Sequence, residues 1–169
     1  MPRIAVSDDL GSWMGLRPEL GAGLVALSEA VYGKSQLPAR VHELARMRIA
    51  LANECEVCRN ARYAQGPDQG LDADFYAHVA EWRSWPGYSM REKLAAEYAE
   101  GIALDHVRLR DDADFWQRLR QHYRDEEIVD LAICCSLWLG AGRTMRALDL
   151  GQTCALTLQR QDARELALA

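Results

Sequence analysis

One stretch of the chain, residues 37–66, constrains the fold more than any other. It reads LPARVHELARMRIALANECEVCRNARYAQG. Pro38 stands where the first turn of a helix tolerates proline, and apolar residues then recur at helical spacing up to a polar break at Asn53. A second helix is predicted from Cys55 to about Gln65. The stretch therefore predicts two consecutive helices with a bend between them.

The rest of the chain repeats the helical periodicity. Further helices are predicted over residues 18–32, 71–85, 90–105, 112–123 and 125–139, and helical spacing returns in the tail from 144 to 169. Asp72 is a predicted N-cap, as is Asp125, and Ser89 with Glu92 matches a capping box. The segment 125–139 is apolar nearly all round, which predicts the most deeply buried helix.

No segment shows the sustained alternation of a half-buried strand. The predicted fold class is therefore all-α, a compact domain of about seven or eight helices. Residues 1–15 carry no clear period and are predicted to be an N-terminal arm. Residues 16–169 are predicted to form a single helical domain, which is an ordinary size for one hydrophobic core.

Charge and hydropathy exclude several classes of partner. The formal net charge is -5 and no basic stripe occurs, so neither nucleic acid nor an anionic membrane surface is predicted to bind. No apolar run approaches the length of a membrane span, and the first residues lack the long apolar region of a signal peptide. These features predict a cytoplasmic protein.

The pair Cys55 and Cys58 is the candidate for chemistry. Five cysteines is an odd number, which argues against an extracellular disulfide framework, and in a reducing compartment such a pair is more often redox-active or metal-binding. A zinc site needs about four ligands, and no second Cys-x-x-Cys pair occurs. If Asn53 caps the helix, its N-terminus favours a thiolate, and this reasoning alone gives Cys55 the lower pKa. Arg59 and Arg62 would lower a thiol pKa, whereas Glu54 and Glu56 would raise it, so the net direction of the shift stays open.

The remaining candidate residues have ordinary structural interpretations. Cys134 and Cys135 occur in an apolar helix and are predicted to be packing residues, and Cys154 is predicted to be inert. Three histidines with charged neighbours in the sequence are predicted to lie at the surface. Four tryptophans at helical positions are predicted to be core or subunit contacts. These residues are His78, His106, His122, Trp82, Trp85, Trp116 and Trp138.

Glu43, an eleven-residue gap, Cys55-x-x-Cys58 and a position four further on together resemble a known signature. It is that of the carboxymuconolactone decarboxylase superfamily, in its alkylhydroperoxidase D-like (AhpD-like) branch. The likeness continues through residues 91–95, 125–131 and 142–148. The resemblance implies a compact all-helical domain that assembles into homo-oligomers, commonly trimers or hexamers, with a dimer as a further possibility.

The resemblance also implies a thiol peroxidase acting on hydrogen peroxide or organic hydroperoxides. Cys58 would be oxidised to a sulfenic acid, and Cys55 would resolve it as a disulfide. An external dithiol such as a lipoylated or thioredoxin-like protein would reduce the pair. Glu43 would belong to a proton relay, and neither a metal nor an organic cofactor is implied.

One position departs from the family pattern. The relay of the family ends on a histidine four residues after the second cysteine, and this chain has Arg62 there. A guanidinium is effectively never deprotonated, so Arg62, with Arg59, can support a thiolate only by charge. Along one straight helix Glu43 would be too far from Cys58 for proton transfer, so the chain must turn near Asn53 or Glu43 must act on another subunit.

Three other interpretations of the same residues remain open. His42 could replace the missing base, although neighbouring residues of a helix point in different directions. The chain could be a decarboxylase like the founding members of the superfamily, a reaction that has no need of a redox dithiol. The loss of the histidine also fits a non-catalytic oligomeric redox sensor.

Overall fold

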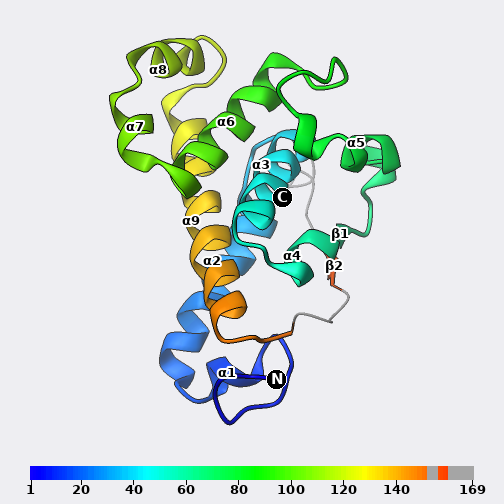
Figure 1. Cartoon of the computed structure of the whole chain (residues 1–169), viewed down its shortest axis with the longest axis vertical. Coiled ribbons are helices and arrows are strands. Elements are labelled where there is room, and N and C mark those ends of the chain that lie inside the picture. Colours follow the sequence, from blue (N-terminus) through cyan, green and yellow to red (C-terminus); the bar gives the residue numbers. More distant parts are fainter. Residues whose placement is uncertain (152–155, 160–169) are drawn as a thin grey trace.

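The computed structural model describes residues 1–151 and 156–159. Among these residues the chain is mostly helical with only two short strands, which confirms the all-α prediction (Figure 1). The elements are α1 (Ser12–Gly15), α2 (Pro18–Lys34), α3 (Ala39–Ala52), α4 (Glu56–Asn60), β1 (Arg62–Tyr63), η1 (Pro67–Gln69), α5 (Ala73–Ala77), η2 (Val79–Glu81), α6 (Met90–Leu104), α7 (His106–Asp111), α8 (Ala113–Arg120), α9 (Asp125–Ala147) and β2 (Thr157–Leu158).

Helix α3 lies between two hydrophobic cores and contributes to both. Val41 and Ile49 belong to a core shared with α2, α6, α8 and α9. Leu44 and Met47 belong to a second core, which holds α5 and the segment around β1. Every residue from 41 to 47 is buried, so α3 is the most enclosed helix of the described chain.

Helix α9 is the longest helix, and it packs against α2, α3 and α6. By length and composition it is the one helix of residues 1–151 that could cross a membrane, but these contacts are those of a core helix. The prediction that residues 125–139 form the most deeply buried helix is wrong, because Val129 is 56% exposed and Ile133 is 47% exposed. Among the described residues, two apolar side chains one turn apart on α9, Val129 and Ile133, are therefore left exposed.

The predicted caps largely agree with the structure. Asp72 accepts a hydrogen bond from the Phe75 amide at the start of α5, and Ser89 and Glu92 form the complete capping box of α6. Asp125 is instead the first residue of α9, and its N-cap is Arg124.

Two predicted helices differ in extent from the observed elements. Residues 71–85 do not form one helix, because the backbone of His78 leaves helical geometry and its ring stacks on Trp85 at 4.4 Å. The segment divides into α5 and η2. The predicted end of the helix 125–139 is also too early, since α9 continues through Gly140 and Gly142 to Ala147.

The predicted helix from Cys55 to Gln65 is wrong beyond Asn60. Residues Arg62 and Tyr63 form strand β1, which pairs in parallel with β2 in the register Arg62 to Thr157 and Tyr63 to Leu158. The expected helical tail is likewise wrong at residues 157–158, and its remainder beyond residue 151 lies mostly outside the described residues. This pairing brings the C-terminal segment beside α4.

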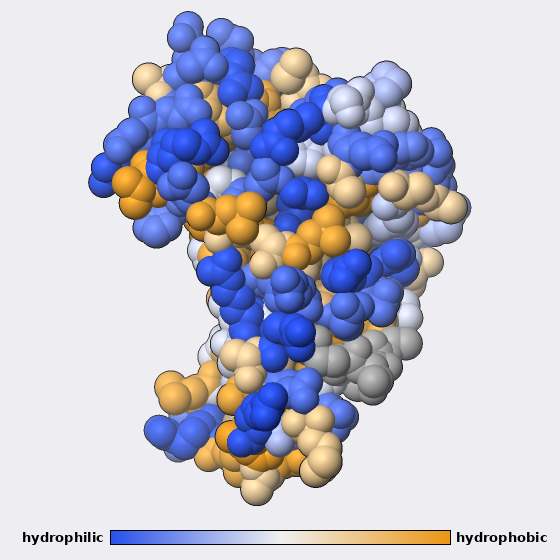
Figure 2. All heavy atoms as spheres, in the orientation of Figure 1, coloured by the Kyte–Doolittle hydropathy of each residue, from blue (hydrophilic) through white to orange (hydrophobic). Residues whose placement is uncertain are grey.

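The N-terminal arm, residues 1–15, includes the short helix α1 and lies at the lower end of the molecule in Figure 1, below the ends of α2 and α9. Hydrophobic residues are exposed there on the surface, as Figure 2 shows for this lower part. Next to the arm in the sequence, Leu16 and the α2 residues Leu20 and Val25 are also exposed, at 60%, 66% and 42%.

Candidate functional site

The cysteine pair is delivered by the turn that ends α3. The amide of Cys55 donates to the carbonyl of Ala50 at 3.2 Å, and the amide of Glu54 donates to the carbonyl of Leu51 at 3.1 Å. These are the two hydrogen bonds of a Schellman motif, in which the residue after the C-cap adopts the left-handed conformation. Glu54 adopts it, with φ of 51°. The chain therefore turns next to Asn53, as a link between Glu43 and Cys58 requires.

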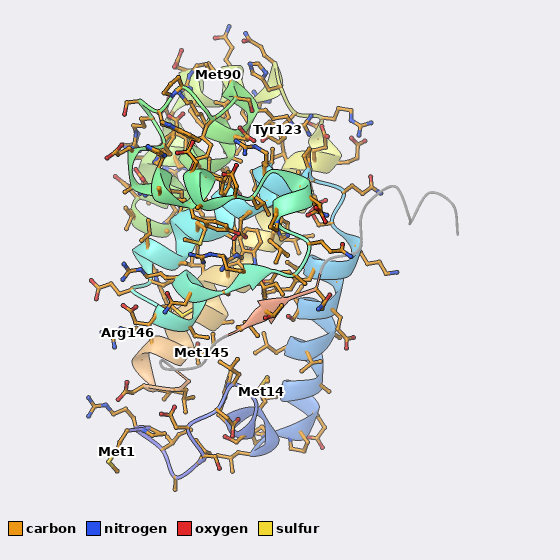
Figure 3. The ribbon with its side chains drawn as sticks, turned by 90° about the vertical axis from the view of Figure 1, so that its right-hand side faces the viewer. Met1, Met14, Met90, Tyr123, Met145 and Arg146 are labelled. Atoms are coloured by element: carbon orange, nitrogen blue, oxygen red, sulfur yellow. A yellow bond between two sulfur atoms is a disulfide. The ribbon has the colours of Figure 1, made fainter. Side chains whose placement is uncertain are left out.

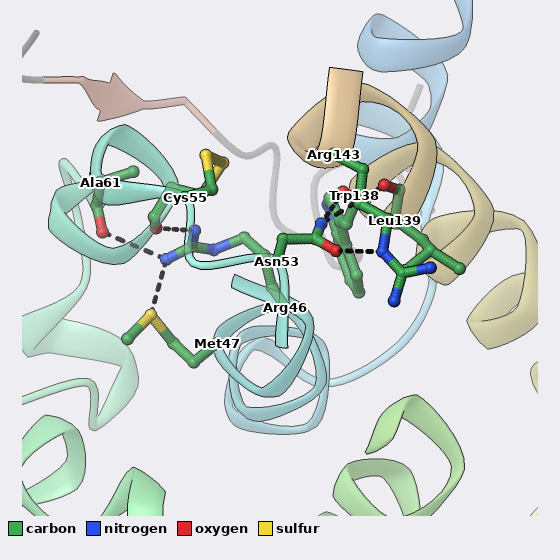
Figure 4. The surroundings of a disulfide bond; sticks show 9 residues. Arg46, Met47, Asn53, Cys55, Ala61, Trp138, Leu139 and Arg143 are labelled. Atoms are coloured by element: carbon green, nitrogen blue, oxygen red, sulfur yellow. Dashed lines mark hydrogen bonds between the residues drawn. A yellow bond between two sulfur atoms is a disulfide. The ribbon is translucent and has the colours of Figure 1, made fainter. Parts of the chain in front are cut away.

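Asn53 does not cap the helix that follows, contrary to the prediction. It is the C-cap of α3, and Cys55 is the N-cap of α4. The side-chain Nδ2 of Asn53 donates to the carbonyls of Trp138 at 3.0 Å and Leu139 at 3.3 Å, and Arg143 Nε donates to Asn53 Oδ1 at 2.9 Å (Figure 4). Asn53 thus fixes the turn against α9.

Cys55 and Cys58 are joined by a disulfide, with their Cα atoms 5.3 Å apart. The two sulfurs have different surroundings. Cys55 is fully buried, whereas Cys58 is partly exposed. A Cβ added at Gly142 of α9 would lie 3.6 Å from the Cys58 sulfur and 2.6 Å from Asn53 Nδ2, so this glycine allows α9 to approach the pair closely.

Arg46 connects Glu43 to the turn that carries the two cysteines, a role that was not predicted from the sequence. Its guanidinium donates to both carboxylate oxygens of Glu43, at 2.6 and 2.7 Å. It also donates to the carbonyls of Cys58 at 2.5 Å and Ala61 at 3.1 Å (Figure 4). The hydroxyl of Tyr76 completes the set with a hydrogen bond of 2.8 Å to Glu43. Glu43 is therefore held by a buried cation and a phenol.

The charges in this cluster shift the neighbouring pKa values. Burial alone would lower the pKa of Arg46, but the charge and hydrogen bonds of Glu43 outweigh it, and the pKa is raised. Burial, followed by the charge of Glu43, raises the pKa of Tyr76. Burial also raises the pKa of Tyr32. At neutral pH the cluster therefore contains a cationic Arg46 and protonated phenols.

Arg62 lies on the other side of Tyr76. Its guanidinium stacks on the Tyr76 ring at 3.9 Å and donates to the carbonyls of Arg59 at 2.7 Å and Ala61 at 2.8 Å. Arg62 is exposed and is not among the described residues that line the pocket beside Cys58. Arg59 is paired with Glu56 at 2.9 Å. Neither arginine has a contact with the sulfur of Cys58 among the hydrogen bonds and ion pairs of the described residues.

His42 of α3 is fully buried. Its Nδ1 is 2.8 Å from the hydroxyl of Tyr63 in β1, and its ring lies edge-on to Trp138 at 4.6 Å. The two rings of Tyr32 and Tyr63 are neighbours of His42 as well. A cluster of aromatic side chains therefore surrounds His42.

The other cysteines and histidines do not form a metal site among the described residues, where no group of three or more His, Cys, Asp or Glu side chains is arranged to bind a metal ion. Cys134 and Cys135 are buried in α9, and burial raises the pKa of Cys135. His106 and His122 are exposed, and His78 is half-buried against Trp85. Cys154 lies outside the described residues.

A pocket of about 850 Å³ opens beside Cys58. Cys58, Arg46 and Tyr32 are among its lining residues, and most of the other lining side chains are apolar. Cys55 is not among the described lining residues, so the disulfide presents the sulfur of Cys58 to this space.

Comparison with known proteins identifies a protein family and two relatives that this chain resembles. The model of the carboxymuconolactone decarboxylase family matches residues 18–101. The chain is 26% identical over 122 residues to YdfG of Bacillus subtilis, an alignment that covers 72% of this chain and 82% of that protein. It is 30% identical over 117 residues to YnjA of Escherichia coli, covering 69% of this chain and 63% of that protein. Both relatives are uncharacterised.

Solved structures share the fold. A protein of unknown function from Agrobacterium tumefaciens, provisionally assigned as the antioxidant defence protein AhpD, superposes with a TM-score of 0.72 at 21% identity, over 88% of this chain and 96% of that one. The debrominase Bmp8, in complex with 2,3,4-tribromopyrrole, has a TM-score of 0.68 at 16% identity, over 92% of this chain and 78% of that one. These likenesses show a common helical architecture.

Proposed function

Because the chain belongs to the carboxymuconolactone decarboxylase superfamily and has the AhpD-like fold, we propose that it is a thiol-dependent peroxidase. Cys58 and Cys55 are its redox pair, and hydrogen peroxide or an organic hydroperoxide is its oxidant. The observation that carries the proposal is the disulfide between two cysteines of which one is buried and the other lines a pocket.

In the first step the thiolate of Cys58 attacks the distal oxygen of the hydroperoxide ROOH. A sulfur–oxygen bond forms, the oxygen–oxygen bond breaks, and the products are the Cys58 sulfenic acid and the alkoxide RO⁻. The alkoxide takes up a proton to become ROH. The phenol of Tyr32 lines the pocket and carries a proton at neutral pH, so it is placed to supply this proton.

In the second step the thiol of Cys55 attacks the sulfenic sulfur, which forms the disulfide and releases water. An external dithiol then reduces the disulfide through a mixed disulfide with Cys58 and is itself oxidised. The sum is ROOH and a dithiol giving ROH, water and a disulfide. A lipoylated or thioredoxin-like protein in the cytoplasm would serve as the reductant.

The assignment of Cys58 as the attacking cysteine follows from accessibility. The helix dipole favours a thiolate at Cys55 rather than at Cys58. However, α4 has only 5 residues, and Cys55 is fully buried. A peroxide in the pocket would meet Cys58 first. The family assignment and the exposure of the two sulfurs thus support the same residue.

Arg46 takes the electrostatic role that the sequence analysis assigned to Arg62. Its guanidinium lines the pocket and binds the Cys58 carbonyl, whereas Arg62 covers Tyr76 on the outside. Glu43 orients Arg46 through two hydrogen bonds. In this proposal Glu43 is a positioning residue, and it acts on the cysteine turn through Arg46.

Exposed apolar side chains support the proposal of a homo-oligomer. Val129 and Ile133 of α9, Leu104 of α6 and Val107 of α7 are exposed. A trimer, a hexamer or a dimer could each bury such side chains at a subunit contact.

A stopped-flow assay with hydroperoxide and a dithiol such as dihydrolipoamide tests the proposal. We expect Cys58→Ser to lose turnover, and Cys55→Ser to form about one sulfenic acid per chain without continuing. Cys134→Ser is the control, because Cys134 lies outside the disulfide. Equal turnover in wild type and Cys58→Ser would remove the idea. Reversible loss of two thiols without fast turnover would identify a redox sensor instead.

A further inference from the structure

The pocket beside Cys58 is much larger than hydrogen peroxide requires. Its volume is about 850 Å³, within the range of sites that bind small organic molecules. A water molecule takes about 30 Å³ of liquid volume, so hydrogen peroxide would leave most of the space unfilled. A molecule with a bulky apolar body would fill it and displace water from its wall.

One wall of this pocket is built by the N-terminal arm. Leu10, Trp13 and Met14 line it from the arm, and Trp138 and Met145 line it from α9. Met14 and Met145 lie on the two sides of the space between the arm and the body of the molecule (Figure 3). The indole nitrogen of Trp13 donates to the Leu10 carbonyl at 3.2 Å, which orients the ring within the arm.

The arm is tied to the end of α9 by polar contacts. The terminal amino group of Met1 pairs with Asp149 at 2.9 Å, and the amide of Arg3 donates to the Leu148 carbonyl at 2.9 Å. The amide of Gly151 donates to Asp8 at 2.6 Å. These contacts hold the arm beside the pocket.

Gly21 of α2 lets the arm pack closely. A Cβ at this position would lie 2.7 Å from the carbonyl oxygen and 2.9 Å from the Cβ of Met14. The first of these atoms is backbone, so a side chain at Gly21 would force α1 away from α2. Gly23, two residues further along the same helix, has nothing within 4 Å of its added Cβ.

The matched family region begins at residue 18, so the arm wall lies outside it. We infer that Trp13 and Met14 determine the specificity of the pocket, and that they select hydroperoxides with an aromatic or branched-alkyl body over hydrogen peroxide. The hydroperoxide group meets Cys58, and the apolar body packs against the arm. The inference rests on the proposed peroxidase activity.

The first experiment compares kcat/KM for cumene hydroperoxide and hydrogen peroxide in Trp13→Ala, Gly21→Leu and the matched control Gly23→Leu. Lost contacts in an apolar pocket reduce discrimination about 10-fold or more. We therefore expect about a tenfold fall for cumene hydroperoxide in Trp13→Ala and Gly21→Leu. The rate with hydrogen peroxide and both rates of Gly23→Leu should stay within about twofold of wild type. An equal fall for both oxidants, or no fall, overturns the inference.

A second measurement does not depend on turnover. Isothermal titration of the oxidised protein with 2-phenyl-2-propanol, the alcohol formed from cumene hydroperoxide, reports the apolar part of the site. We expect binding to wild type and Gly23→Leu, and about tenfold weaker binding to Trp13→Ala and Gly21→Leu. If wild type consumes no hydroperoxide, the proposed function fails and this titration decides alone. Binding that is absent from wild type or equal in all four proteins overturns the arm wall.

Discussion

The carboxylate of Glu43 lies on a buried part of α3, where Arg46 and Tyr76 donate three hydrogen bonds to it. The spacing to the cysteine pair was enough to single out Glu43 from the sequence. Arg46 could also have been found, because a glutamate on a helix with apolar neighbours needs a counter-charge three or four residues away. The contacts of Arg46 with Cys58 and Ala61 could not, since they depend on the turn after α3.

A double-mutant cycle on this pair follows from its burial, with Arg46 at 3% exposure and Glu43 at 0%. Arg46→Met would leave Glu43 charged and without its cation, and we expect a loss of about 3–5 kcal/mol in unfolding free energy. Arg46→Met in a Glu43→Gln background should lose clearly less, because no buried charge remains. Urea unfolding of the four proteins measures the coupling. An identical loss in both backgrounds would show that the pair is not coupled.

At the scale of elements, the helices with local signals were predicted well. Pro18, Pro38 and the capping box at Ser89 act within a few residues of where they occur, and α2, α3 and α6 begin there. The region after Cys58 was predicted wrongly, because the partner of β1 is residues 157–158. Helical periodicity has no access to a strand pair that forms between segments so far apart in the sequence.

The turn that carries the cysteines has a conformational strain that can be relieved. Glu54 has φ of 51° without being glycine, and the left-handed region disfavours residues with a Cβ by about 1–2 kcal/mol. Glu54→Gly should therefore raise the free energy of unfolding by about 1 kcal/mol. Glu54→Ala is the control, because it removes the charge and keeps the Cβ. Thermal unfolding distinguishes them, and equal stabilisation by both substitutions would assign the effect to charge.

At the scale of the whole molecule, the sequence predicted one helical domain and identified Cys55 and Cys58 as its candidate site. It did not predict how the arm, α9 and the C-terminal segment meet around Cys58, because these segments lie at opposite ends of the chain. Tertiary contacts between these segments bring the residues that line the pocket together beside Cys58. The family pattern therefore located the cysteines, while the shape of the pocket required the structure.

One polar centre joins several of these elements and gives the fold an expected pH dependence. Glu100 of α6 is hydrogen-bonded by Arg48 of α3 and by Trp82 and Arg83, which follow η2. Burial would raise the pKa of Glu100, but the hydrogen bonds from Arg83 and Trp82 and the charge of Arg48 outweigh it. The pKa is therefore lowered from 4.5.

A carboxyl group whose pKa is lower in the folded state contributes stability above its unfolded pKa and loses it as the pH falls through its folded pKa. The contribution of Glu100 is thus complete above about pH 4.5 and declines below it. Glu100→Gln should be less stable than wild type at pH 7, by about 1–3 kcal/mol, and the difference should shrink below pH 4.5. Glu97→Gln, on the same helix and paired with Arg118, is the control. Urea midpoints measured from pH 3 to 7 give the comparison, and a difference that stays constant over this range would mean that the ionisation of Glu100 does not link these elements.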